Sequence, residues 1–140
     1  MKTKEWLNRA LNVEKEISIL EEELEEVSNR ITYTSIHTDK DKVEATAKSK
    51  DTGYLAMIQY QTMLSESISN LYAVKLEIVE VINSVDDSVA RCILELRYLK
   101  GEKWETIANC INYDYYYTIK VLHPKALKLA TQYIKPIKTT

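Results

Sequence analysis

The amino-acid sequence predicts an all-α protein, in which a long antiparallel helical hairpin (a coiled coil) precedes a small helix-turn-helix domain. Three observations support this prediction. The 140-residue chain has only two glycines, two prolines and no phenylalanine, which disfavours a turn-rich β protein. Apolar residues recur in alternating steps of three and four along the first two thirds. The last third holds three shorter helical patterns, separated by residues that end or begin helices.

Two apolar seams predict the hairpin. The first indicates a helix of roughly 30 residues, or about 45 Å, and comprises Trp6, Ala10, Val13, Ile17, Leu20, Leu24, Val27 and Ile31. The second comprises Met57, Tyr60, Leu64, Ser67, Leu71, Val74, Ile78, Val81 and Val85. Each helix can cover the apolar stripe of the other. Between them, residues His37 to Gly53 are polar, charged and small, and we expect a loop there, with one helical turn around Val43 to Ala47 as an alternative.

The hairpin, residues 1–85, is expected to dimerise. A two-helix hairpin leaves apolar flanking residues partly uncovered, and a second copy of the chain would cover them. These residues are Ile19, Ile58, Ile68 and Ile82. The sequence favours a homodimer, although a monomer whose hairpin packs on its own C-terminal domain stays open as the alternative.

Residues 86–140 are predicted to form the helix-turn-helix domain. Its helical patterns are Val89, Cys92, Ile93 and Leu96; then Trp104, Ile107, Ala108 and Ile111; then Ile119, Leu122, Ala126, Leu129 and Tyr133. Gly101 lies where a helix end favours a left-handed residue. Asn112 tolerates that conformation in the second turn, and Asp114 can cap the following helix. So short a turn makes the last two helices cross steeply, which suits the major groove of DNA.

The same segment carries a family resemblance. The stretches LELRYLKG (94–101), WETIA (104–108) and LHPKAL (122–127) resemble region 4 of bacterial sigma factors. More closely, they resemble the sigma-region-4-like regulators of Gram-positive phages and prophages, the ArpU- and RinA-type late transcription regulators. The resemblance covers about 40 of 140 residues. It implies a helical hairpin joined to a helix-turn-helix, and a sequence-specific DNA-binding transcription regulator of phage or prophage origin.

The chain departs from the family pattern at three places. Lys103 stands where the family often has a serine or threonine cap. The span from Tyr113 to Leu122 is one residue longer than that pattern. Pro124 falls where helix would continue, and its ring would clash with the carbonyl of Lys120. We therefore expect the recognition helix to end or kink near His123.

The predicted DNA contacts gather at the start of the third helix. A tyrosine hydroxyl can bond a phosphate or a base edge, its ring can contact a thymine methyl, and lysines can meet phosphates. The predicted contact residues are Lys103, Tyr115, Tyr116, Tyr117, Lys120, Val121, Lys125 and Lys128. By contrast, Tyr113 is expected to plug the core and Trp104 to be a core residue first. His123 is expected to serve carbonyls of its own chain.

Charge is divided unequally along the chain. Residues 1–85 hold ten Lys/Arg against fifteen Asp/Glu, whereas residues 86–140 hold nine against six. After Asp114 there are five lysines and no acidic residue. A polyanion would therefore meet the C-terminal end. Exposed helices also carry lysines for solubility alone, and charge by itself does not choose between the two interpretations.

Two other functions stay open. One is an adaptor that binds RNA polymerase or another protein through the coiled coil without contacting DNA. The other is the small DNA-recognition subunit of a phage packaging terminase, which is expected to form a larger ring. Enzymatic activity is not expected, because the sequence has no phosphate loop, nucleophile elbow, HExxH motif or carboxylate–histidine cluster.

No cofactor or metal is expected. Cys92 and Cys110 lack metal-binding spacing and lie on apolar helix faces, which predicts buried free thiols. His37, Asp39 and Asp41 are interpreted as solvating residues of the loop. No segment has the apolar length of a signal peptide or a bilayer span, so we expect a cytoplasmic protein without membrane contact.

Overall fold

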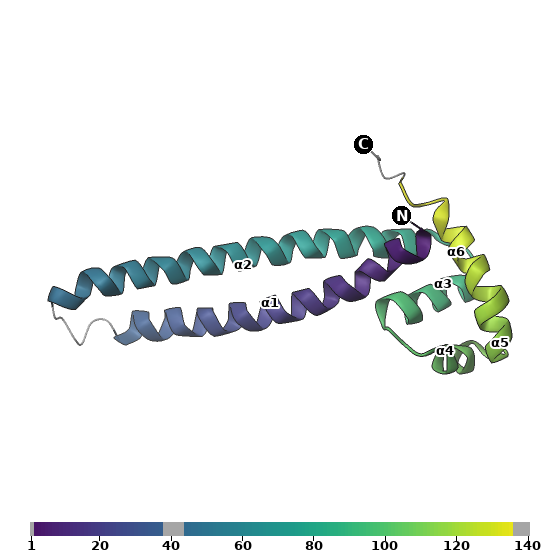
Figure 1. Ribbon diagram of the computed structural model, residues 1–140, viewed down its shortest axis with the longest axis horizontal. Coiled ribbons are helices and arrows are strands. Elements are labelled where there is room, and N and C mark those ends of the chain that lie inside the picture. Colours follow the sequence, from purple (N-terminus) through teal and green to yellow (C-terminus); the bar gives the residue numbers. More distant parts are fainter. Residues whose placement is uncertain (1, 38–43, 136–140) are drawn as a thin grey trace. The chain divides into compact units, whose positions relative to one another are not determined.

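The computed structural model describes residues 2–37 and 44–135, and all the regular structure in these ranges is helical (Figure 1). This confirms the predicted all-α class. The helices are α1 (Thr3–His37), α2 (Glu44–Ser84), α3 (Ser88–Leu94), η1 (Glu95–Leu99), α4 (Trp104–Ile111), α5 (Tyr115–Tyr117), η2 (Thr118–Leu122) and α6 (His123–Thr131). The two η segments are π-helical turns.

The chain forms two compact units. The multi-helix unit consists of Met1–Glu14 and Ala73–Thr140, and the two-helix unit consists of Lys15–Tyr72. Helices α1 and α2 therefore each contribute to both. The two compact units have other bounds than the two predicted domains, residues 1–85 and 86–140, and that division into domains stays a prediction. The buried core of the multi-helix unit includes residues from both sides of that division.

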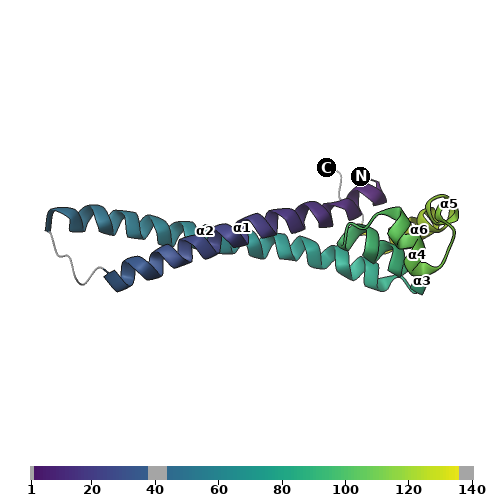
Figure 2. The ribbon, with the colours of Figure 1, turned by 90° about the horizontal axis from the view of Figure 1, so that it is seen from below.

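In the two-helix unit, α1 and α2 lie side by side and run in opposite directions (Figures 1 and 2). Seam residues Ile17, Val27 and Leu64 are buried. Two polar contacts also join the helices: the Tyr60 hydroxyl donates to the Glu23 carboxylate at 3.0 Å, and the Gln61 amide donates to Ser28 Oγ at 3.0 Å. An open groove of about 420 Å³ runs between the helices, lined by Glu23, Glu26, Val27, Arg30, Ala56, Met57 and Tyr60.

The start of α2 corrects the predicted loop. Helix α1 extends to His37 and α2 begins at Glu44, so His37 and residues 48–53, expected as loop, are helical. Residues 44–47 are helical, as the alternative of one turn had it, and residues 38–43 lie outside the described residues. Polarity predicted a loop there, but the residues EATAKSK at 44–50 are mostly good helix formers. Asp39 and Asp41, interpreted as solvating residues, lie outside the described residues.

The multi-helix unit is built on a core that collects the N-terminal turns of α1, the C-terminal turns of α2 and the shorter helices. Its buried members are Trp6, Leu7, Ala10, Ile78, Val81, Ile82, Val85, Ala90, Leu94, Tyr98, Ala126 and Ala130. Ile82, expected to be a partly uncovered flank, is fully buried here. The sequence seam placed it beside the hairpin interface, but residues of α3 and α6 fill the side that a lone hairpin would leave open.

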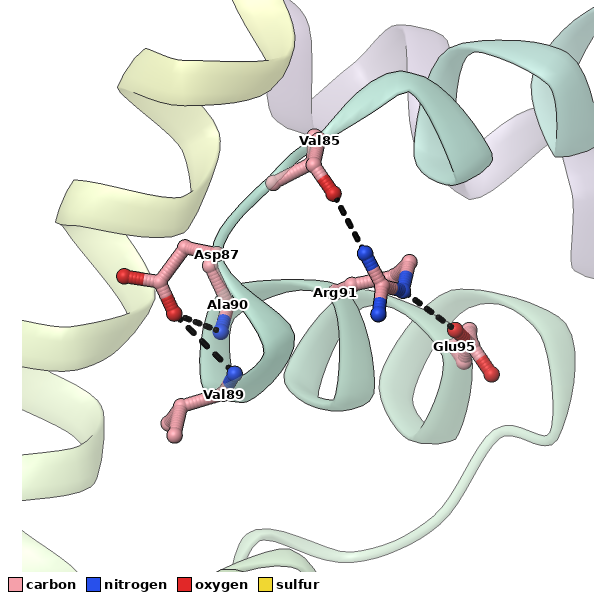
Figure 3. A network of polar contacts seen from close by, with 6 residues as sticks. All are labelled: Val85, Asp87, Val89, Ala90, Arg91 and Glu95. Carbon is pink, nitrogen blue, oxygen red and sulfur yellow. Dashed lines mark hydrogen bonds and ion pairs between the residues drawn. The ribbon is translucent and has the colours of Figure 1, made fainter.

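The connection from α2 to α3 is fixed by polar contacts (Figure 3). Asp87 caps α3, and its carboxylate accepts the backbone N–H groups of Val89 and Ala90, both at 3.0 Å. These contacts, the Ala90 bond foremost, lower the pKa of Asp87, against a smaller opposing effect of burial. Arg91 donates to the Val85 carbonyl at 2.8 Å and lies 3.8 Å from the Glu95 carboxylate. The end of α2 is therefore tied to the first turn of the C-terminal helices.

Gly101 has the left-handed conformation that the sequence predicted, with φ +69°. A Cβ at this position would lie 3.3 Å from Leu11 Cδ2. We expect Gly101→Ala to lower the free energy of unfolding by about 1–2 kcal/mol, because an L-residue is strained at this φ and Leu11 must also give way. Urea denaturation followed by circular dichroism measures the change.

Gly53 supplies the matched control for this substitution. It lies inside α2, and nothing approaches within 4 Å of a Cβ placed there. Gly53→Ala should therefore raise the free energy of unfolding by about 0.5–1 kcal/mol, since alanine is the better helix former. Destabilisation of similar size by both substitutions would contradict the conformational explanation.

Candidate nucleic-acid interface

The turn between α4 and α5 has the predicted local chemistry. Asn112 adopts the left-handed conformation (φ 60°, ψ 42°) and its backbone N–H bonds the Ala108 carbonyl. Asp114 caps α5, and its carboxylate accepts the Tyr117 N–H at 3.1 Å. The Thr118 hydroxyl donates to the Asp114 carbonyl at 2.8 Å, and Thr118 is fully buried. Both the left-handed residue and the cap are confirmed, and they fix where the next helix starts.

Residues 115–131 form one continuous helix, here called the candidate recognition helix, made of α5, η2 and α6. The helix does not end near His123, because Leu122 and His123 both keep right-handed helical dihedrals; the alternative, a kink there, stays a prediction. The π turn is the physical reason. The His123 N–H bonds the Thr118 carbonyl, one residue further back than in an α-helix, and α6 then starts with Pro124 in its first turn. The helix thereby continues past a residue that lacks an N–H.

The π turn also takes in one residue more than an α turn would. Thr118 is fully buried, and Ile119 and Leu122 are half-buried, so these three side chains form the inward face of the helix. The opposite side of the helix, which we call the outer face, consists of Tyr116, Tyr117, Lys120 and Val121, all exposed.

Every predicted DNA-contact residue is exposed. Tyr115, Tyr116 and Tyr117 lie on α5, Lys120 and Val121 on η2, Lys125 and Lys128 on α6, and Lys103 directly before α4. Among the three tyrosines and Val121, Tyr116 has the largest exposed fraction, 67%, and Val121 is 45% exposed. Exposure is what a contact surface requires, but it does not by itself test the assigned contacts.

The tyrosine rings contact one another in pairs. Tyr115 and Tyr116 meet edge to face, with centroids 5.3 Å apart, and Tyr113 stacks on Tyr117 at 5.9 Å. The expectation that Tyr113 plugs the core is wrong, since its side chain is 44% exposed. Its ring lies against Tyr117, one turn along the chain, and so extends the aromatic surface instead of the core.

The lysines differ in their surroundings. Lys125 Nζ lies 3.6 Å from the Asp87 carboxylate, the group that caps α3. A phosphate would have to compete with Asp87 for this ammonium group. Lys103, Lys120 and Lys128 make no ion pair with any residue in the described ranges. These three are therefore available to an anionic partner.

On the inner side of the candidate recognition helix, His123 is buried and its Nε2 lies 2.6 Å from the Tyr98 hydroxyl. Burial, with the positive charges of Lys4 and Arg97, lowers the pKa of His123 to about 4, so the ring is neutral at pH 7. Burial raises the pKa of Tyr98 to about 12. The expected role of His123 toward backbone carbonyls, or toward phosphate, is therefore wrong. Its partner is a phenol 25 residues earlier.

Trp104 completes this inner cluster. Its ring lies 4.5 Å from that of His123, and the Arg97 guanidinium stacks over it at 4.7 Å. Arg97 also donates to the Glu102 carbonyl at 2.9 Å. Trp104 is half-buried, which fits its predicted role in packing. Tyr98 was not among the predicted core positions, although its four-residue spacing from Leu94 is the signal that marks it as one.

The cysteines only partly match their prediction. Cys92 is half-buried, and burial together with the charge of Glu95 raises the pKa of its thiol. Cys110 is exposed, so its prediction as a buried thiol is wrong: it lies at the edge of the apolar stripe of α4, whose buried members are Ile107 and Ala108. No cluster of three or more potential metal ligands occurs within residues 2–37 and 44–135.

Comparison with known proteins found no match: no protein-family model, curated protein or solved structure matches this chain. Across the helices that the structure describes, none combines the length and apolar character needed to cross a bilayer.

Proposed function

We propose that this protein binds double-stranded DNA through the candidate recognition helix, as a sequence-specific transcription regulator of phage or prophage type. The proposal rests on the arrangement of one helix. Thr118 and His123 hold its inner side against the other helices, while Tyr116, Tyr117, Lys120 and Val121 stand outward on the opposite side. A helix held in this way at the end of a short turn is the element that helix-turn-helix proteins insert into the major groove.

Charge around the helix supports the proposal. Lys103, Lys120 and Lys128 are exposed and unpaired within the described ranges. Of the acidic residues nearby in sequence, Asp114 is engaged in capping α5. A phosphate backbone approaching here meets ammonium groups and phenol hydroxyls, both of which bind phosphate oxygens.

A salt titration tests DNA binding. We expect the full chain to bind a duplex, in fluorescence anisotropy, with an affinity that falls steeply as NaCl rises. Three to four lysine–phosphate contacts per chain correspond to a slope of log K against log[NaCl] of about −3. Selection and sequencing of bound duplexes would then identify the preferred site. No binding at low salt would contradict the proposal.

The remaining parts of the proposal concern partners. We propose a homodimer that acts in the cytoplasm, places two recognition helices on two half-sites and can also touch RNA polymerase, as the resemblance to sigma-region-4-like regulators implies. Mass measurement by light scattering distinguishes this dimer from the larger ring expected of a terminase small subunit.

A second candidate function is an adaptor that binds another protein through the two-helix unit. The observation that favours it is the exposure of large apolar side chains there, with Ile19 at 60%, Leu55 at 62% and Met63 at 64%. Exposed apolar residues in such number mark contact surfaces. An adaptor of this kind would show no salt-dependent affinity for DNA, so the same titration separates the two functions.

A further inference from the structure

The outer face presents only a few kinds of side-chain group. It presents two phenol rings, one isopropyl group and one ammonium group, from Tyr116, Tyr117, Val121 and Lys120. It has no arginine, asparagine or glutamine, the side chains that make paired hydrogen bonds to guanine or adenine. Lys120 can reach a guanine edge or a phosphate as a point charge. Most of what this face can offer to base edges is therefore apolar.

The apolar part of this face is open to water. Tyr116 is 67% exposed, and Tyr117 and Val121 are each 45% exposed. In the major groove, one base edge carries an apolar group of its own, the C5 methyl of thymine. Contact between such a methyl and these side chains would remove apolar surface of both partners from water. No other base edge in unmodified DNA offers this complementarity.

The rings are held in place before any ligand arrives. Tyr117 stacks on Tyr113 with an interplanar angle of 20°, and Tyr116 meets Tyr115 at 84°. Below them, the cap at Asp114 and the buried hydroxyl of Thr118 fix the backbone. These contacts reduce the side-chain entropy that is lost on binding, which helps a contact of small area contribute to specificity.

The helix geometry gathers the apolar groups on one side. Val121 follows Tyr117 by four positions and Tyr116 by five, and η2 (Thr118–Leu122) carries the π-turn hydrogen bonds between them. Residues four apart are neighbours on an α-helix surface, and a π turn, which bonds residues five apart, also brings the fifth position toward the same side. Val121 therefore extends the apolar surface that begins at the two rings.

Building on the DNA-binding function proposed above, we propose that the outer face recognises the 5-methyl groups of thymine in the major groove. Tyr116 and Val121 are the specificity-determining residues, and Lys120 anchors the same face by its charge. The preferred sites are then rich in thymine at the positions that this helix faces. Tyr117, stacked on Tyr113, lies between the two specificity-determining side chains in sequence and supports the same surface.

Thymine-to-uracil replacement tests this inference directly. Two duplexes of identical mixed sequence are compared by anisotropy with the full chain at one salt concentration, one with thymine and the other with uracil at every such position. The two duplexes differ only in the C5 methyl groups of thymine. We expect the uracil duplex to bind at least about fourfold more weakly, the factor for one methyl group that is no longer buried.

Two variants assign the effect to residues. Tyr116→Ala with Val121→Ala should bind the two duplexes equally. Val121→Thr keeps the branched shape but replaces one methyl by a hydroxyl group, and should reduce the thymine preference without disturbing the helix. Tyr72→Ala, which removes an exposed tyrosine of the two-helix unit (44% exposed), should keep the full preference. Circular dichroism checks that each variant is folded.

The outcomes distinguish the recognition of thymine methyl groups from DNA binding itself. Equal, salt-dependent binding of both duplexes by the unmodified chain overturns methyl recognition and leaves DNA binding standing. Failure to bind either duplex at low salt overturns the proposed function itself. A thymine preference that survives in folded Tyr116→Ala, Val121→Ala protein overturns the assignment to these side chains.

Discussion

Simultaneous replacement of Tyr116 and Lys120 by alanine is expected to weaken DNA binding by roughly 30-fold or more, about 2 kcal/mol. Both side chains are exposed on the candidate recognition helix. Among residues 2–37 and 44–135, the one contact that the double replacement removes is the edge contact of Tyr116 with Tyr115, so misfolding would not explain a loss of binding. The loss of one lysine–phosphate contact should also reduce the salt slope by about one. Anisotropy over a NaCl series measures both quantities.

A matched double variant controls for the removal of a ring and a charge. Lys15→Ala with Tyr72→Ala makes the same chemical changes at exposed positions of the two-helix unit. It should leave affinity and salt slope unchanged. Both variants should keep the helicity and solution mass of the unmodified chain. Unchanged DNA affinity in the Tyr116→Ala, Lys120→Ala variant would refute the assigned surface, whereas an equal loss in the control would indicate a nonspecific effect of net charge.

Features of this protein that depend on neighbouring residues could be predicted from the sequence. Gly101, Asn112 and Asp114 act through their own dihedrals or through backbone groups within a few positions, and all have the predicted conformation or role. The inward position of Thr118 follows in the same way from helical spacing. Residues close together in the sequence determine such features, so the sequence pattern alone can predict them.

Features that depend on tertiary contacts could not be predicted. The burial of Ile82 requires α3 and α6 to cover α2, and the hydrogen bond of His123 requires Tyr98, which is remote in sequence. The π turn before Pro124 is a third example. A proline predicts the loss of a backbone hydrogen bond, but whether the helix ends or shifts its bonding depends on the packing of the helix on both sides. Periodicity alone contains none of this information.

The buried His123 predicts a marked dependence of stability on pH. Its pKa in the folded protein is about 4, against 6.5 for an unperturbed histidine. Between these values the unfolded chain binds a proton that the folded chain does not, so the free energy of unfolding must fall as pH decreases. The stabilisation is complete above about pH 6.5 and is lost progressively toward pH 4, at up to about 1.4 kcal/mol per pH unit and about 3 kcal/mol in all.

The groups around His123 explain the direction of this effect. The imidazole accepts or donates one hydrogen bond with Tyr98, lies against the Trp104 ring and is repelled, when protonated, by Lys4 and Arg97. No carboxylate contributes to its pKa. Asp87 titrates in a lower window: its lowered pKa gives stability that is present above about pH 4 and is lost below it. The two contributions can therefore be separated by pH.

Urea denaturation at closely spaced pH values between 4 and 7.5 measures this dependence. His123→Gln should lose most of the pH dependence in this window, although it is less stable at pH 7 because the packing against Trp104 changes. Tyr98→Phe should cost about 1–3 kcal/mol at pH 7, since it leaves a buried imidazole nitrogen without a partner. If the free energy of unfolding of His123→Gln falls as steeply between pH 6.5 and 4 as that of the unmodified chain, other groups cause the pH dependence. The imidazole is then not held neutral on the inner side of the candidate recognition helix.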